Sequence, residues 1–130
     1  MAKGKLSDLT ALMDVQTRAS QTKLRKIKAR EAQLLQLLAD LSDTRNGLAA
    51  GGAEEGRTAR DFQNDLQHLR WFDQRRAMIN IELAQVRALL DMARKDLKHH
   101  FARQQALDRV LDSTAAQDRL IKLRRATYGS

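Results

Sequence analysis

The sequence predicts an all-α protein in which two long helices form an antiparallel coiled-coil hairpin with a C-terminal helical overhang. Three observations lead to this fold class. The 130 residues include no Pro, and most of the abundant residue types form helices well. Apolar residues recur at heptad spacing in two stretches that a Gly-rich segment separates. One Trp, one Tyr and three Phe supply too little aromatic surface for a thick globular core.

The first helix is expected over about residues 5–49. Every seventh residue from Leu6 onward is apolar except one, in the series Leu6, Met13, Ser20, Ile27, Leu34, Leu41 and Leu48. A second apolar track, three or four residues further on, comprises Leu9, Leu24, Leu37 and Leu38. Gln16 and Lys23 interrupt this second track. Two tracks at this spacing predict one apolar seam along the helix.

A turn is expected at about residues 50–57. The stretch RNGLAAGGAEEG holds four of the six Gly residues of the chain, and Gly is disfavoured inside helices but favoured just past their ends. No Lys-Ser or Lys-Thr follows the glycines, so the stretch does not match a phosphate-binding loop. Thr58 or Asp61 is expected to begin the second helix.

The second helix is expected over about residues 58–127. Its heptad positions are Leu69, Phe72, Arg76, Ile79, Leu83, Val86, Leu90, Ala93, Leu97, His100, Gln104, Leu107, Leu111 and Thr114, of which ten are apolar. It is the longer helix, and at 1.5 Å per residue the difference leaves a C-terminal overhang of roughly 35 Å. The stretch TAAQ (114–117) resembles a capping box, so a separate short helix is the alternative to the continuous helix that we expect.

Charge and composition exclude several classes of function. The net charge is +8, with basic ends and a neutral middle. The absence of Cys excludes disulfides, thiolate zinc sites and a Cys nucleophile. His68, His99 and His100 do not form the i, i+4 pair that binds zinc on a helix. We therefore expect no enzyme, no cofactor, no metal site and no small-molecule substrate.

The chain is also expected to be a cytoplasmic protein. Its first residues lack the apolar run of a signal peptide. No stretch approaches the roughly 18 to 20 apolar residues of a membrane span.

The stretch LRWFDQRRAMINI (69–81) contains the only Trp. Phe72 falls on the predicted seam, whereas Trp71, Met78 and Ile81 do not all fit it. Exposed apolar side chains on a thin helical rod are typical of partner contacts, and Trp and Met are typical of interfaces. Two interpretations stand: a docking patch, or packing of the turn segment onto the hairpin.

Two basic stretches are further candidates for partner binding. KLRKIKAR (23–30) spreads its cations around the helix, and RLIKLRRATY (119–128) combines cations with Leu120, Ile121 and Leu123. Solvated helix surface is one interpretation, docking on an acidic protein is the second, and nucleic-acid binding is the third. The candidate residues are Lys23, Arg25, Lys26, Arg119, Lys122, Arg124 and Arg125.

Across nearly its whole length the chain resembles the FliJ/YscO family, the small basic coiled-coil stalk proteins of flagellar and type III secretion export. The most specific local similarity is RWFDQRRAMINIEL (70–83), an aromatic residue followed by Gln and then apolar residues at helical spacing. The resemblance implies a coiled-coil stalk that links the export ATPase ring to the FlhA-like export gate and escorts export chaperones. It also implies a location at the cytoplasmic face of the secretion apparatus, with only indirect contact to the membrane.

The resemblance also implies two partner-binding regions. The family docks on the gate through apolar surface positions of its second helix, which correspond here to Ala77, Ile81, Ala84 and Ala88, with Trp71 and Met78 adding apolar surface. The basic residues of the two ends would fit the ATPase ring. The alternative functions are a basic helical arm that binds nucleic acid and a generic coiled-coil scaffold subunit.

Overall fold

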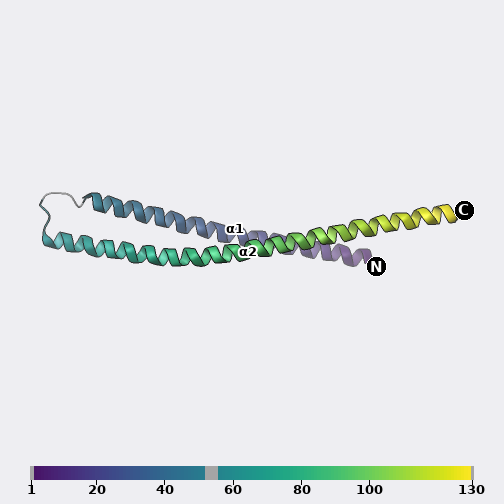
Figure 1. The fold of residues 1–130 in the computed structure, drawn as a ribbon, viewed down its shortest axis with the longest axis horizontal. Coiled ribbons are helices and arrows are strands. Elements are labelled where there is room, and N and C mark those ends of the chain that lie inside the picture. The colour runs from purple at the N-terminus through teal and green to yellow at the C-terminus, as the bar shows by residue number, and fades with distance from the viewer. Residues whose placement is uncertain (1, 52–55, 130) are drawn as a thin grey trace. The chain divides into compact units, whose positions relative to one another are not determined.

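A computed structural model describes the backbone of residues 2–51 and 56–129 and the side chains of residues 4–50 and 56–129. Two α-helices account for nearly all of it: α1 spans Ala2–Gly51 and α2 spans Ala59–Tyr128 (Figure 1). No strand occurs in the described ranges. The predicted all-α class and the pair of long helices that pack on one another are confirmed.

The chain divides into two compact units, and both helices run through each of them. Unit 1 comprises Met1–Leu24 and Ala93–Ser130, and unit 2 comprises Arg25–Met92. Each unit therefore pairs one segment of α1 with one segment of α2, and the closed end of the hairpin belongs to unit 2.

The core of unit 2 is a single apolar seam between the two helices. Leu34 is fully buried against Ile79, Leu83 and Val86 of α2. Ile27, Leu38 and Leu41 of α1 pack partly buried around this cluster. Phe72 and Leu90 extend the seam along α2 in both directions. Burial of these side chains on one stripe per helix is the main source of stability that the hairpin geometry offers.

Ion pairs beside the seam align the two helices of unit 2 antiparallel. Arg45 of α1 lies 3.6 Å from Asp73 of α2, and Nε of Arg87 donates to Oε2 of Glu31 over 3.4 Å. Arg30 also pairs with Glu82. Arg45 thus pairs with Asp73, whereas Arg30 and Glu31, which come earlier in α1, pair with Glu82 and Arg87, which come later in α2. This is the antiparallel order. Each pair is partly exposed, so these pairs select the register more than they add to stability.

A buried polar cluster, here called the polar layer, aligns the helices of unit 1. The Thr17 side chain is 4% exposed, and its hydroxyl lies 2.9 Å from the Met13 carbonyl oxygen and 3.0 Å from Oε1 of Gln104. Nε2 of Gln104 in turn reaches Oδ1 of Asp14 at 3.5 Å. Burying a hydroxyl without a hydrogen-bond partner would destabilise the folded chain. The cluster therefore favours the alignment of the two helices that brings Thr17 next to Gln104.

A reciprocal cap starts α2. The backbone N–H of Asp61 donates to Oγ1 of Thr58 over 3.3 Å, and the backbone N–H of Thr58 donates to Oδ2 of Asp61 over 3.2 Å. This is a capping box with Asp in place of Glu, and it makes Thr58 the residue that precedes the helix. Gly56 has φ of +91°, a left-handed conformation that a side chain would strain.

The predicted boundaries differ from the structure by a few residues. α1 begins at Ala2 rather than at residue 5 and continues to Gly51, two residues beyond the predicted end. The predicted turn at 50–57 therefore overlaps the last turn of α1, and residues 52–55 lie outside the described ranges. Helix ends are the least specified part of a periodic pattern because solvent-exposed terminal turns depend weakly on side-chain identity.

The predicted second track of α1 is partly wrong. Leu9 and Leu37 are each 40% exposed, and Leu48 at the end of the first track is 42% exposed. The residues that face α2 instead lie four residues after each first-track residue, in the series Thr10, Thr17, Leu24, Glu31, Leu38 and Arg45. Gln16 and Lys23, predicted as interruptions, lie outside the seam. The structure thus places polar side chains in the seam of α1, and Thr17, Glu31 and Arg45 have partners across it.

The predicted heptad series of α2 is confirmed except at one residue. All of its positions are buried or half-buried apart from Arg76, which is exposed beside the Arg45–Asp73 pair. A guanidinium placed at a seam position reaches solvent at the edge of the helix pair.

The continuous form of α2 is confirmed, and the separate short helix after residue 114 is not found. The Thr114 hydroxyl donates to the carbonyl oxygen of Val110, one turn earlier, over 2.8 Å. It therefore contacts the preceding turn of the same helix and does not cap a new one. Beyond Asp118 every described side chain is exposed, and in unit 1 this end of α2 forms the predicted overhang (Figure 1).

Candidate docking face on the second helix

A row of uncharged side chains lies on the side of α2 that faces away from the seam. We call this row the outer stripe, and it belongs to unit 2. Its members recur at alternating steps of three and four residues, as Trp71, Gln74, Met78, Ile81, Gln85, Ala88 and Met92. Every one of them is exposed, because the apolar seam already turns the opposite side of α2 toward α1.

Four members of the outer stripe are large apolar side chains that are more than half exposed. Trp71 is 55% exposed, Ile81 is 61% exposed, and Met78 and Met92 are each 62% exposed. Leu89, beside the stripe, is 50% exposed. Scattered surface leucines are ordinary, but a contiguous row of Trp, Met and Ile is the kind of surface that binds another macromolecule.

Trp71 is held in place by the seam. Its ring makes an edge-to-face contact with the buried ring of Phe72, with centroids 5.2 Å apart and planes at 74°. An open groove beside it is bordered by Leu37 and Thr44 of α1 and by Arg75 of α2. The indole is therefore anchored at one edge while more than half of its surface remains exposed, which is typical of a pre-positioned interface side chain.

All six residues predicted for gate binding lie on this exposed side of α2. Trp71, Met78, Ile81 and Ala88 belong to the outer stripe, and Ala77 and Ala84 lie next to it, both exposed. Sequence reasoning missed Met92, Leu89 and the two Gln residues that complete the repeat. The signal was the regular three–four spacing outside the main heptad series, which becomes visible once the main series is assigned to the seam.

The cations predicted for the ATPase ring are all exposed, and they belong to both units. In unit 1, Lys23 borders a shallow hollow with Asp96 and His100, whereas Arg119, Lys122, Arg124 and Arg125 lie on the overhang. Arg25 and Lys26 are exposed in the α1 segment of unit 2. On the overhang the cations accompany Leu120, Ile121 and Leu123, which are 56%, 48% and 63% exposed. The overhang thus combines apolar and cationic surface on one helix.

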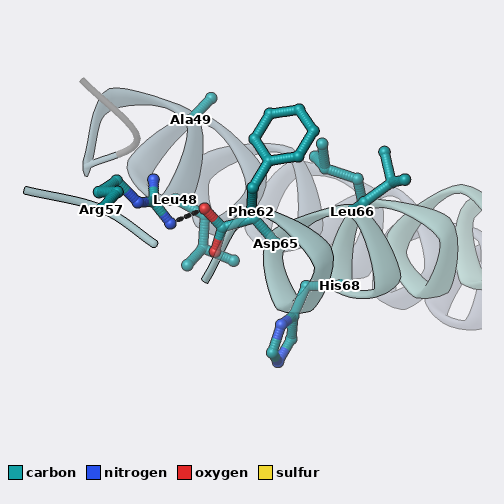
Figure 2. Close-up of a pocket in the computed structure, with 8 residues that line it drawn as sticks. Leu48, Ala49, Arg57, Phe62, Asp65, Leu66 and His68 are labelled. Carbon is teal, nitrogen blue, oxygen red and sulfur yellow. Dashed lines mark ion pairs between the residues drawn. The ribbon is translucent and has the colours of Figure 1, made fainter. Parts of the chain in front are cut away.

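The closed end of the hairpin carries a separate apolar hollow of about 200 Å³ (Figure 2). Leu48 of α1 and Phe62 and Leu66 of α2 border it, and an ion pair between Arg57 and Asp65 lies on one side. Phe62 is 69% exposed. The sequence prediction did not include this hollow, although Phe62 and Leu66 at i, i+4 spacing were available as a signal.

The electrostatics of the closed end follow from the cap. Hydrogen bonding from the Thr58 backbone N–H, and next from the Thr58 side chain, holds the pKa of Asp61 below its ordinary value, with the positive charge of Arg57 acting in the same direction. Among the described residues, no three His, Cys, Asp or Glu side chains come together as metal ligands. Neither helix, over its described length, has a stretch apolar enough to cross a bilayer.

Comparison of the chain with protein-family models, with curated protein sequences and with solved structures found no match.

Proposed function

We propose that this chain is a non-enzymatic coiled-coil stalk of a flagellar or type III protein export apparatus, which links the export ATPase ring to the export gate and escorts export chaperones. The observation that carries the proposal is the outer stripe: Trp71, Met78 and Ile81 stand exposed in a row on a helix whose other side is already packed. Such a surface offers binding energy to a protein partner.

The gate is the partner that we assign to the outer stripe. The exposed positions of the FliJ/YscO family's gate-docking segment correspond to Ala77, Ile81, Ala84 and Ala88, all of which are exposed here. Three alanines give a low, smooth surface that lets a partner approach the helix closely, and the neighbouring Trp71 and Met78 supply the larger contacts. The stripe would then contribute the apolar centre of the interface.

The ATPase ring is the partner that we assign to the overhang. Arg119, Lys122, Arg124 and Arg125 are exposed there beside three exposed apolar residues. A helix of this composition suits an acidic groove or pore, because the apolar face supplies contact area and the cations supply long-range attraction. In this arrangement the protein is cytoplasmic and touches the membrane only through the gate.

Binding of the purified chain to the cytoplasmic domain of the export gate tests the assignment of the outer stripe. Trp71→Ala combined with Met78→Ala is expected to weaken gate binding by about ten- to a hundredfold, because each truncation of an interface anchor costs on the order of 1 kcal/mol or more. Leu12→Ala combined with Val15→Ala is the matched control, since those side chains are 54% and 62% exposed but lie on α1. Equal gate affinity for the two double variants would refute the assignment.

Binding to the export ATPase tests the overhang. Arg124→Glu combined with Arg125→Glu is expected to weaken this binding most at low salt, because screening reduces the contribution of exposed charges as ionic strength rises. An unchanged affinity would argue against docking through the overhang.

If instead neither export protein binds and the chain binds RNA with a steep salt dependence, a nucleic-acid arm replaces the stalk as its function.

A further inference from the structure

The outer stripe has the spacing of a coiled-coil seam. Its seven members alternate by three and four residues from Trp71 to Met92, which is the repeat that packs α1 against the other side of α2. The 22 positions correspond to about 33 Å of helix at 1.5 Å per residue. The surface that complements such a row is another α-helix, whose side chains fit between those of the stripe.

We propose that the outer stripe pairs antiparallel with the outer stripe of a second copy of this chain. The pairing is two-fold symmetric, with its axis crossing α2 between Ile79 and Asn80. In such a pair the same surface of both copies forms the interface, so the stripe must fit a copy of itself turned by the two-fold rotation. The stripe meets this requirement in both its side-chain volumes and its charges.

The volumes match in each layer of the antiparallel pair. Coiled-coil geometry then places three kinds of layer along the interface: Trp71 opposite Ala88, Gln74 opposite Gln85, and Met78 opposite Ile81, each occurring twice by symmetry. Met92, the seventh member, lies beyond these layers. A large ring meets a small methyl group, two amides can hydrogen-bond to each other, and two similar aliphatic chains meet at the centre. Alternation of large with small side chains is what lets two helices approach closely.

The charges beside the stripe select the same register. In an antiparallel pair, each residue that flanks the seam faces a residue that flanks the same side of the partner's seam. Arg70 then lies near Asp91 of the second copy, and Arg75 lies near Glu82 of the second copy. All four of these symmetry-related contacts join opposite charges. Glu82 also contacts Arg30 of its own chain, and a carboxylate with two oxygens can accept from both guanidinium groups.

Other alignments bring like charges together. Sliding the second helix by one heptad in one direction places Glu82 opposite Glu82, and sliding it in the other direction places Arg75 opposite Arg75. A parallel pair in register places Arg70 beside Arg75. Like charges beside a helix seam disfavour that pairing, so antiparallel pairing centred between Ile79 and Asn80 is the arrangement that the sequence of charges selects.

Pairing and gate binding exclude one another because both need Trp71, Met78 and Ile81. The self-pairing inference does not depend on the proposed export function, since it concerns the purified chain alone. A failed gate-binding assay would not contradict self-pairing, and a chain that stays monomeric would not contradict gate binding.

Sedimentation equilibrium of the purified full chain, from micromolar to millimolar concentration at low salt, tests the pairing. The mass is expected to rise with concentration from 14.8 kDa toward twice that value. Met78→Asp is expected to keep the mass at that of a monomer, whereas Val15→Asp, which changes a side chain of the same 62% exposure on α1, is expected to pair normally. Circular dichroism of both variants checks that helicity is retained.

Charge exchange tests the register. Asp91→Arg is expected to weaken pairing at least tenfold, and adding Arg70→Asp is expected to restore it. The chain has no Cys, so a mixture of Gln74→Cys and Gln85→Cys chains should form a disulfide-linked pair on oxidation, while either variant alone should not. A monomer at every concentration would overturn the inference and leave the outer stripe to a different partner. Pairing by Met78→Asp, or disulfide formation by Gln74→Cys alone, would overturn the proposed surface or orientation.

Discussion

Replacement of Leu34 by Ala is the sharpest test of where the seam lies. Leu34 is the one large side chain among the described residues that is completely buried, and Ile79, Leu83 and Val86 of α2 surround it. Removing most of a buried Leu costs about 2–5 kcal/mol through lost transfer free energy and the space left behind. A seam between two helices has solvent at both edges, so the neighbours can close part of that space.

We therefore expect Leu34→Ala to lower the free energy of unfolding by about 2.5 kcal/mol, toward the lower end of that range. With a urea dependence of about 1.5 kcal/mol per molar, the unfolding midpoint would fall by about 1.7 M. Urea titration followed by circular dichroism at the helix minimum measures this shift. A loss of this size is a large share of the stability of an ordinary domain.

Leu35→Ala is the matched control, because it makes the same chemical change one residue further along the same helix. Leu35 is 43% exposed, and substitutions at such positions change the free energy of unfolding by no more than about 0.5 kcal/mol. The change in helix propensity is the same in both variants and cancels. Equal losses for the two variants would refute the assignment of Leu34 to the seam.

Two further predictions concern the polar layer and the cap. Thr17→Val should destabilise the chain by about 1–2 kcal/mol in thermal unfolding, because it leaves Gln104 without its buried partner. Adding Gln104→Leu should recover most of that loss. A double variant less stable than the single one would contradict this account. Because the pKa of Asp61 is lowered in the folded chain, the capping box should stabilise the start of α2 above the ordinary Asp pKa and lose that contribution as the pH falls through the lowered pKa. Protection of the amides in the first turn of α2, measured relative to the intrinsic exchange rate at each pH, should fall over that acidic range. Thr58→Ala should remove this fall in protection. An identical protection profile in the variant would show that the cap is not its cause.

The candidate docking face was largely predictable, and its full extent was not. Trp71, Met78 and Ile81 stood out because they did not fit the main heptad series. The complete stripe includes Gln74 and Gln85, whose polar side chains give no hydrophobic signal. Their place in the repeat could be recognised only after the seam of α2 had been assigned to α1.

The sequence by itself determined the two helices and the seam of α2. These features depend on local properties: the absence of Pro, the glycines near the turn and the spacing of apolar residues along one helix. The positions that face α1 are mostly apolar in α2, so periodicity alone identifies them.

The tertiary structure decided which side of α1 meets α2. The predicted second track combined positions three residues after the first track, which hold Leu9 and Leu37, with positions four residues after it, which hold Leu24 and Leu38. The track that packs also contains Thr17 and Glu31, which find Gln104 and Arg87 across the seam. The pattern of residues within α1 does not identify those partners, because they lie more than fifty residues away in the chain. Thr17, Glu31 and Arg45 take seam positions where the second helix supplies groups that pair with them.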